Sequence, residues 1–264
     1  ADYSIFKTYG ALLDLIERAF SRSSPLFSLV VYNPLEYYLG DPADIDAMKS
    51  GRLTNVVTLI RTQFLKRFES SVYAFETSCD RLLRKLLAFL KKHCETDYEK
   101  DLLTNWLTKN ESLLNYTTQK QLDLWDEEEE DDPELFPEEL LAWWDKLERH
   151  EYDIPSIIKM TFLDLDELVK FLKETRKFKP TKDDKLNKLK RMLRSKEFIG
   201  KKVIIFTEFA DTARYLEKYL KDDGVDGIAR IDGGTQGKRY DAIRRFAPYY
   251  NSSSSAGLVE EGLK

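Results

Sequence analysis

The sequence predicts an α/β protein with a mainly helical N-terminal part and a smaller βαβα unit at its C-terminal end. Two observations carry this prediction. Apolar residues recur at helical spacing from the first residues to about Gly200. After Gly200, two short apolar runs of strand length alternate with two amphipathic segments. We expect residues 1–180 to form long helices, in a bundle or a protrusion, and residues 181–264 to form an incomplete parallel-sheet unit.

The composition is typical of a soluble, globular chain. Of its 264 residues, 34% are charged and 42% are apolar. No apolar stretch approaches the ~20 residues that span a bilayer, and the N-terminus lacks the pattern of a secretory signal. With only Cys79 and Cys94, a disulfide framework is not expected, and a reducing cytoplasm is the predicted compartment. A stable metal site needs about four ligands, so adjacent His93 and Cys94 predict none.

Charge is strongly polarised along the chain, although the net charge is only −5. Residues 123–153 hold 15 acids and 2 bases, whereas residues 167–202 hold 14 bases and 5 acids. Asp126–Asp132 is a run of seven consecutive acids. Mutual repulsion predicts a solvated loop there, with an interaction tail as the alternative.

The clearest periodic pattern predicts one long helix from about Thr58 to Lys92. We expect helices near Tyr98–Lys109 and Glu138–Arg149 to pack against it. Trp143 and Trp144 fit a core position better than a platform for stacking bases. The stripe consists of Leu65, Phe68, Val72, Phe75, Cys79, Leu82, Leu86 and Leu90.

The predicted βαβα unit begins after Gly200. Val203–Phe206 is a short, β-branched run that predicts a buried parallel strand. An amphipathic helix follows and ends near Gly224, and Ile228–Ile231 is the second predicted strand. The loop Asp232–Gly234 then leads into another helix through Phe246. This order predicts parallel strands joined by a right-handed crossover.

Several pieces of this region together resemble a known family. They are Lys185-Leu186, the stretch KKVIIFTEFADTARYLEKYL at 201–220, and IDGGTQGKRYDAIRRF at 231–246, with Arg239 and Phe246 seven residues apart. This set resembles the start of the second motor half, a RecA-like lobe, of Swi/Snf-like (RapA-like) superfamily 2 DNA helicases and translocases. The resemblance covers about a quarter of the chain and implies a cytoplasmic, bacterial protein.

The resemblance implies that the loops after both strands contact the nucleic-acid backbone. Helix N-termini offer N–H groups suited to phosphate, and glycine permits close approach. Two alternatives stay open: the glycines close a tight βα turn, and Arg239 forms a surface salt bridge with Asp232. The implied nucleic-acid-binding residues are Thr207, Glu208, Gly233, Gly234, Thr235 and Arg239.

A second segment, RTQFLKRFESS at 61–71, resembles the Leu-Lys-Arg stretch that bridges the two lobes in bacterial RapA-like proteins. The resemblance implies that Lys66 and Arg67 brace the lobes, and the helical region resembles the protrusions inserted between them. The alternative is that one of these side chains only snorkels. The basic helix Lys185–Lys196 is interpreted as a solvated face.

Catalytic motifs are missing from the sequence. Gly234–Arg239 fails as a phosphate-binding P-loop, because Asp232 stands where a glycine is needed and Arg239 where Ser or Thr is needed. Phe162–Glu167 continues as a helical apolar pattern, which argues against a magnesium-binding acid pair. The sequence also stops before the family's downstream Gly-containing loop and arginine finger. Because the predicted sheet would have only two strands, we expect an artificial or proteolytic boundary. We predict no ATP hydrolysis by this chain alone.

Taken with the resemblance, the sequence predicts part of a DNA-dependent ATPase, with ATP and magnesium as cofactors of the parent and none held by this chain. The implied partner is duplex DNA, and no membrane partner is expected. The helical region also offers a surface for a protein partner. The alternative function is a helical protein–protein interaction scaffold with a degenerate RecA-like remnant.

Overall fold

A computed structural model shows how the chain folds. It divides into two compact units, which we call the helical unit (Tyr9–Phe178) and the C-terminal unit (Ala1–Thr8 with Lys179–Lys264). The residues that the structure describes are 4, 8–21, 27–41, 43, 45, 47–124, 144, 147–233, 239–251, 254, 256 and 257. The acidic run at 126–132 and Trp143 lie outside them.

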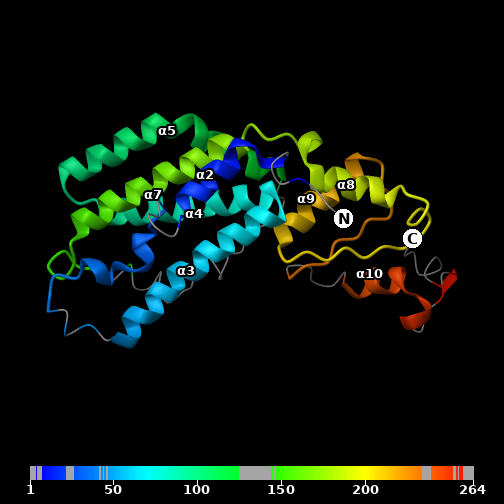
Figure 1. Cartoon of the computed structure of the whole chain (residues 1–264), viewed down its shortest axis with the longest axis horizontal. Helices are drawn as coiled ribbons and strands as arrows, with labels where there is room; N and C mark the ends of the chain where they lie inside the picture. Colours follow the sequence, from blue (N-terminus) through cyan, green and yellow to red (C-terminus); the bar gives the residue numbers. More distant parts are fainter. Residues whose placement is uncertain are drawn as a thin grey trace. The chain divides into compact units, whose positions relative to one another are not determined.

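The helical unit is a bundle of long helices (Figure 1). Helix α4 is buried along most of its length and packs against α3, α5 and α7. Two short 3-10 helices, η1 and η2, follow α2 in the chain. The bounds are α2 Ala11–Ala19, η1 Val30–Tyr32, η2 Pro34–Tyr37, α3 Ala47–Ser70, α4 Val72–His93, α5 Asp97–Leu124 and α7 Ile154–Thr175.

Aromatic side chains fill the middle of this bundle. Phe75 of α4 lies 5.4 Å from Phe68 and 5.6 Å from Phe171, measured between ring centroids. Phe27 packs edge-on against Phe64 at 5.6 Å. Offset and edge-to-face pairs at these separations stabilise a core beyond the burial of their area. The aromatic positions of three helices and one loop therefore converge on a single core.

The predicted helix from Thr58 to Lys92 is wrong as one element, because the chain breaks at Ser71. That residue is extended, with φ −162° and ψ 152°, and its side chain accepts a hydrogen bond from the Ala74 N–H as an N-cap. Helices α3 and α4 face the same core from either side of the break, so the apolar spacing runs on across it. Serine is a favoured N-cap, and this signal was present in the sequence.

A short connection ties the start of α7 to the segment after η2. Tyr38 and Tyr152 form an isolated antiparallel bridge. The Leu39 N–H donates to the Glu151 carbonyl at 2.8 Å, and the Asp153 N–H donates to the Tyr37 carbonyl at 2.8 Å. The bridge fixes where α7 enters the bundle.

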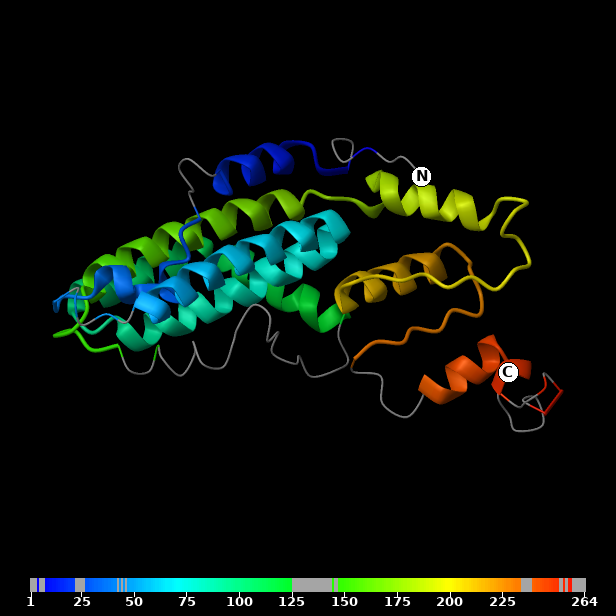
Figure 2. The same cartoon turned by 60° about the horizontal axis from the view of Figure 1, so that its bottom comes forward.

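The C-terminal unit contains three helices and two short 3-10 turns among its described residues. Two extended segments, 203–209 and 228–233, alternate with α9 and α10 and run in the same direction as each other (Figure 2). The bounds are η4 Pro180–Lys182, α8 Asp184–Leu193, α9 Ala210–Asp222, α10 Arg239–Phe246 and η5 Tyr249–Asn251.

The predicted parallel sheet of a RecA-like βαβα unit is contradicted. Helices make up 71% of the structure and strands 1%, and no sheet occurs among the described residues. Val203–Phe206 and Ile228–Ile231 are extended, but no ladder of backbone hydrogen bonds joins them. A strand needs a hydrogen-bonded neighbour about 4.8 Å away, and among the described residues neither segment has a ladder partner. Several of their apolar side chains are exposed, with Ile204 at 58% and Phe206 at 90%.

Candidate nucleic-acid interface

The two units carry opposite net charge. The C-terminal unit holds 20 bases and 14 acids, a net of +6, whereas the helical unit holds 22 bases and 33 acids, a net of −11. Binding to phosphates is driven by cations and by the counterions they release. The charge therefore favours the C-terminal unit as the part that contacts a polyanion.

The first predicted contact lies immediately before α9. Thr207 and Glu208 are both exposed, whereas Phe209 is buried and stands at the N-cap of α9 without a side-chain cap. Asp211, in the first turn, is 3% exposed and pairs with Arg214 at 3.3 Å. A carboxylate in the first turn already interacts favourably with the positive end of the helix dipole. A phosphate at this site would therefore contact the backbone and the Thr207 hydroxyl in competition with the Asp211 carboxylate.

The second predicted contact surrounds the start of α10. Gly233 is exposed, while Gly234 and Thr235 lie outside the described residues. Arg239 is the first residue of α10, is exposed, and donates from Nη2 to the Asp232 carbonyl at 2.9 Å. The Asp232 carboxylate instead lies 3.2 Å from Arg230 Nε. The alternative of an Arg239–Asp232 salt bridge is thus replaced by a hydrogen bond to the backbone.

The fold brings these two loops to one side of the C-terminal unit. Helices α9 and α10 run in the same direction, and their N-terminal ends lie on the same side (Figure 2). Thr207 and Glu208 precede one of these ends, and Gly233 and Arg239 precede or begin the other. The described residues that the resemblance links to nucleic acid, Thr207, Glu208, Gly233 and Arg239, therefore share one end of this unit.

The basic helix α8 plays a different part. Lys190 and Arg194 both pair with Asp223, at 3.2 and 2.5 Å, just beyond the end of α9. Leu186, one turn before Lys190 on the same face of α8, is buried. Two of its cations therefore hold α8 against α9, and Arg191 remains 69% exposed on the solvated face.

The predicted brace residues occupy unlike environments. Lys66 is exposed, whereas Arg67 is 4% exposed, although both lie near the end of α3. Of these two side chains, the one of Lys66 is accessible on the surface of the helical unit and the one of Arg67 is not.

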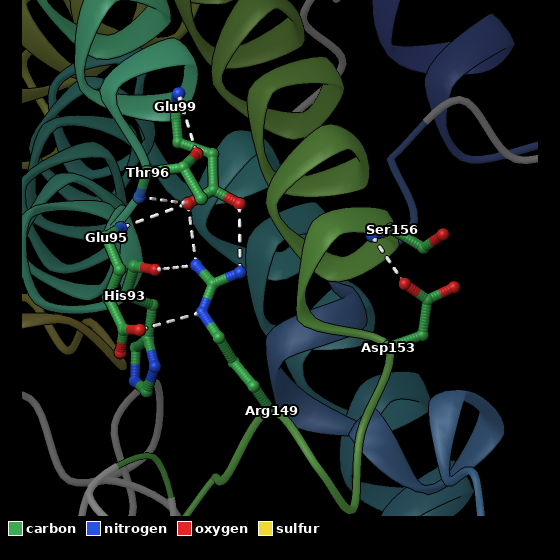
Figure 3. A network of polar contacts seen from close by, with 7 residues as sticks. All are labelled: His93, Glu95, Thr96, Glu99, Arg149, Asp153 and Ser156. Carbon is green, nitrogen blue, oxygen red and sulfur yellow. Dashed lines mark hydrogen bonds and ion pairs between the residues drawn. The ribbon is translucent and has the colours of Figure 1, made fainter.

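A polar network in the helical unit was not anticipated from the sequence (Figure 3). Thr96 and Glu99 form a capping box at the start of α5: the Glu99 N–H donates to the Thr96 hydroxyl at 3.3 Å, and the Thr96 N–H donates to the Glu99 carboxylate at 3.1 Å. Arg149 donates to both Glu99 oxygens and to the His93 carbonyl at 2.7 Å. Its Nε lies 3.0 Å from a Glu95 oxygen. The T-x-x-E signature at 96–99 was the available signal.

This network shifts the pKa of the Glu99 carboxyl. Burial raises the pKa, but the hydrogen bonds from Arg149 and from the Thr96 and Glu95 backbone outweigh burial and hold it at about 2. Figure 3 also shows Asp153 accepting from the Ser156 N–H, as the N-cap of α7. These contacts stabilise helix ends. The hydrogen-bond donors and acceptors that form them are paired with one another.

A second buried polar site centres on Asp164, in the middle of α7. Its carboxylate accepts hydrogen bonds from the Ser28 N–H at 2.6 Å and the Leu29 N–H at 2.7 Å. The side chain is fully buried, and burial raises its pKa to about 7 despite the hydrogen bonds from Ser28 and Leu29. Asp166 accepts from Trp106 Nε1 at 2.9 Å. Both aspartates of the Phe162–Glu167 stretch therefore serve the packing of a helix, as the helical interpretation predicted.

The core predictions for Cys79 and Trp144 are confirmed, and His93 lies at the end of α4. Cys79 is fully buried, and Trp144 is 6% exposed and donates from its indole N–H to the Val31 carbonyl at 2.7 Å. His93 lies against Phe89 and contacts the Trp144 carbonyl through Nε2 at 3.0 Å. Among the described residues, no group of three or more His, Cys, Asp or Glu is arranged to hold a metal ion. No described helix is both long and apolar enough to cross a membrane.

Comparisons with known proteins identify no family for this chain. The chain matches no protein-family model, no curated protein and no solved structure.

Proposed function

We propose that this chain is part of an ATP-dependent DNA translocase of the Swi/Snf-like class, with ATP and magnesium as cofactors of the parent. In this proposal the C-terminal unit contacts the nucleic-acid backbone, and the helical unit belongs to the region between the motor halves. The observation that carries the proposal is the shared position of two loops. The loops that resemble nucleic-acid-contacting motifs both open helices at one end of a basic unit.

The expected mode of contact is sequence-independent. Backbone N–H groups, hydroxyls and guanidinium groups bind phosphate oxygens and fix the register of a protein on a duplex. Thr207 offers a hydroxyl, Gly233 an accessible backbone, and Arg239 a guanidinium. Arg239 already donates one hydrogen bond to the Asp232 carbonyl, which holds its side chain beside the loop. Pre-positioning of this kind lowers the entropy lost on binding.

Duplex binding by the 264-residue chain tests the proposal, measured by fluorescence anisotropy over a range of salt concentrations. Arg239→Ala should weaken binding to all sequences similarly and reduce the slope of log K against log salt by about 1. Arg18→Ala is the matched control, because Arg18 is also exposed and also donates to a backbone carbonyl, that of Asp14, in the acidic helical unit. Equal effects of both substitutions, or no duplex binding by the unaltered chain, would contradict the proposal.

Gly233 permits a sharper test. Its φ is not positive, and a Cβ added there meets nothing within 4 Å, so the turn itself does not require glycine. Gly233→Ala should leave the free energy of unfolding almost unchanged. It should weaken duplex binding if a phosphate approaches this backbone closely. Gly51→Ala is the control, since Gly51 also has open space and lies in α3. Unchanged affinity in Gly233→Ala would place the phosphate elsewhere.

Hydrolysis of ATP is not expected from this chain by itself. Phosphoryl transfer needs a phosphate-binding loop, a magnesium site and a stabilising cation placed together, and the sequence lacks the first of these. Phosphate release assayed with and without duplex DNA should stay at background. Turnover by the purified chain would overturn this part of the proposal.

The exposed apolar segment favours a second candidate, a protein-interaction scaffold. Ile204 and Phe206 are 58% and 90% exposed, which is unusual for side chains of this kind in such close succession. A scaffold would form a complex that survives nuclease treatment and needs no nucleic acid. Loss of every stable complex on nuclease treatment would favour the translocase proposal instead.

A further inference from the structure

The last described elements of the C-terminal unit expose several aromatic rings close together in sequence. Tyr240 of α10 is 61% exposed, and Tyr249 and Tyr250 of η5 are 81% and 96% exposed. Phe246, at the end of α10, is 36% exposed. Rings of this size are usually covered when they serve only packing, so their exposure points to a partner.

The turn that carries Tyr249 and Tyr250 is held in place. The Asn251 side-chain amide donates to the Ala247 carbonyl at 2.8 Å, and the Asn251 N–H donates to the Pro248 carbonyl at 3.1 Å. Pro248 itself is buried. The two exposed tyrosines therefore project from a short 3-10 turn anchored on both sides, so little conformational entropy is lost when they bind a ligand.

Cations are interleaved with these rings. The Arg244 guanidinium lies 5.5 Å from the Tyr240 ring centroid. Lys202 Nζ donates to the carbonyls of Arg245 and Phe246 at 2.9 and 2.6 Å, and it lies 5.9 Å from the Phe246 ring. Helix α10 contains three arginines and one acid. Positive charge and aromatic faces thus occupy the same short segment.

We propose that α10 and η5 form a binding surface for single-stranded nucleic acid, on which unstacked bases stack against Tyr249 and Tyr250 while the arginines of α10 contact the phosphates. Such surfaces combine cations that follow the backbone with aromatic rings that accept any base. Charge complementarity favours this ligand, because the C-terminal unit carries a net charge of +6. The proposal rests on the proposed function for its class of ligand, and it adds a base-stacking contact that duplex binding does not use.

An anionic membrane is the less favoured partner. Membrane-surface helices commonly bury a long apolar face, whereas α10 has eight residues and its exposed rings are mostly tyrosines with a polar hydroxyl. Vesicles containing phosphatidylserine therefore serve as a comparison in the test.

The experiment measures anisotropy of three labelled ligands with the 264-residue chain. These are an oligothymidine of about 16 nucleotides, an abasic oligonucleotide of equal length and charge, and a duplex of equal length. The oligothymidine should bind more tightly than the abasic strand. Changing Tyr249 and Tyr250 together to alanine should remove that advantage, with a loss of about 5-fold or more per stacked base.

The control is Tyr98→Ala, because Tyr98 is 72% exposed on α5 of the acidic helical unit. Tyr249→Phe and Tyr250→Phe keep the aromatic face and should retain tight binding. Circular dichroism and the urea midpoint of the double alanine variant show whether it remains folded. If that variant does not fold, the phenylalanine variants and the abasic comparison still decide the matter.

Each outcome has a distinct meaning. Equal binding of oligothymidine and abasic strand, with duplex binding intact, overturns the stacking surface and leaves the proposed function standing. Base-dependent binding without duplex binding supports the stacking surface and overturns duplex contact. Binding of vesicles alone, or of no ligand at all, overturns both.

Discussion

Arg149 donates hydrogen bonds of 3.1 and 2.6 Å to the two carboxylate oxygens of Glu99, which lies 50 residues earlier in the chain. The same guanidinium reaches the His93 carbonyl at the end of α4. One side chain thereby fixes the end of α4, the start of α5 and the chain leading to α7. Bidentate pairs of this kind add geometric specificity to their electrostatic stabilisation.

Arg149→Ala should lower the free energy of unfolding by about 2 kcal/mol, because it leaves the largely buried Glu99 carboxylate without its charged partner. Urea unfolding followed by circular dichroism measures the change. Lys177→Ala is the control, since the Lys177–Glu174 pair is also close, at 2.5 Å, but its lysine is 69% exposed. We expect less than about 0.5 kcal/mol there. Equal losses would show that Arg149 contributes no more than a surface pair.

Asp164→Asn should lower the free energy of unfolding by about 2 kcal/mol, since its amide nitrogen replaces one of the two oxygens that accept from the Ser28 and Leu29 N–H groups and leaves one buried N–H without its acceptor. Asp166→Asn is the matched control on the same helix. Its remaining amide oxygen can still accept from Trp106 Nε1, so we expect a loss below about 1 kcal/mol. Urea midpoints of the two variants decide the matter, and a smaller loss at Asp164 than at Asp166 would contradict the role given to Asp164.

Acidification should weaken the contribution of His93 to the stability of the helical unit, whereas Asp164, whose pKa is raised to about 7, acts in the opposite direction. Burial lowers the pKa of this imidazole, and Lys92 and Arg149 lower it further, against the raising effect of the Trp144 carbonyl. The folded state therefore binds fewer protons than the unfolded state below the ordinary value of 6.5. The stabilisation of the neutral form is present above 6.5 and is lost as the pH falls below it. This loss is one contribution to the change in urea midpoint between pH 7 and pH 5.5, and a His93 variant isolates it.

His93→Gln should lose less stability between pH 7 and pH 5.5 than the unaltered chain, because Gln can donate to the Trp144 carbonyl without titrating. His150→Gln is the control, since it removes the only other histidine, whose side chain is 73% exposed. The pH dependence should persist in the control. If it disappears in His150→Gln and persists in His93→Gln, the assignment to His93 is wrong.

The break between α3 and α4 makes a further prediction. Ser71→Ala should cost about 1 kcal/mol, because it removes the side-chain acceptor for the Ala74 N–H. Ser112→Ala, at an exposed position inside α5, should be neutral or slightly stabilising, since alanine has the higher helix propensity. Thermal unfolding of both variants provides the measurement. A neutral Ser71→Ala would mean that the N-cap does not set the break.

Part of the candidate site could be read from sequence spacing. Thr207 and Gly233 follow short apolar runs and precede amphipathic segments, and this local order placed both ahead of helices. The position of Arg239 at the first turn of α10 followed in the same way. The hydrogen bond from Arg239 to the Asp232 carbonyl could not be predicted in this way. The sequence shows that the two residues are near each other, but it does not show whether the backbone or the side-chain oxygen of Asp232 accepts.

By itself, the sequence determined the helical character of the first two thirds of the chain, the core positions of Cys79 and Trp144, and the separation of acidic from basic regions. These properties depend on local periodicity and composition. Tertiary structure decided whether extended segments become strands, because a ladder needs a neighbour that no local pattern supplies. It also decided that Asp164 binds the backbone of residues 28 and 29, and that Arg149 reaches Glu99. Both contacts join residues far apart in sequence, and only packing brings them together.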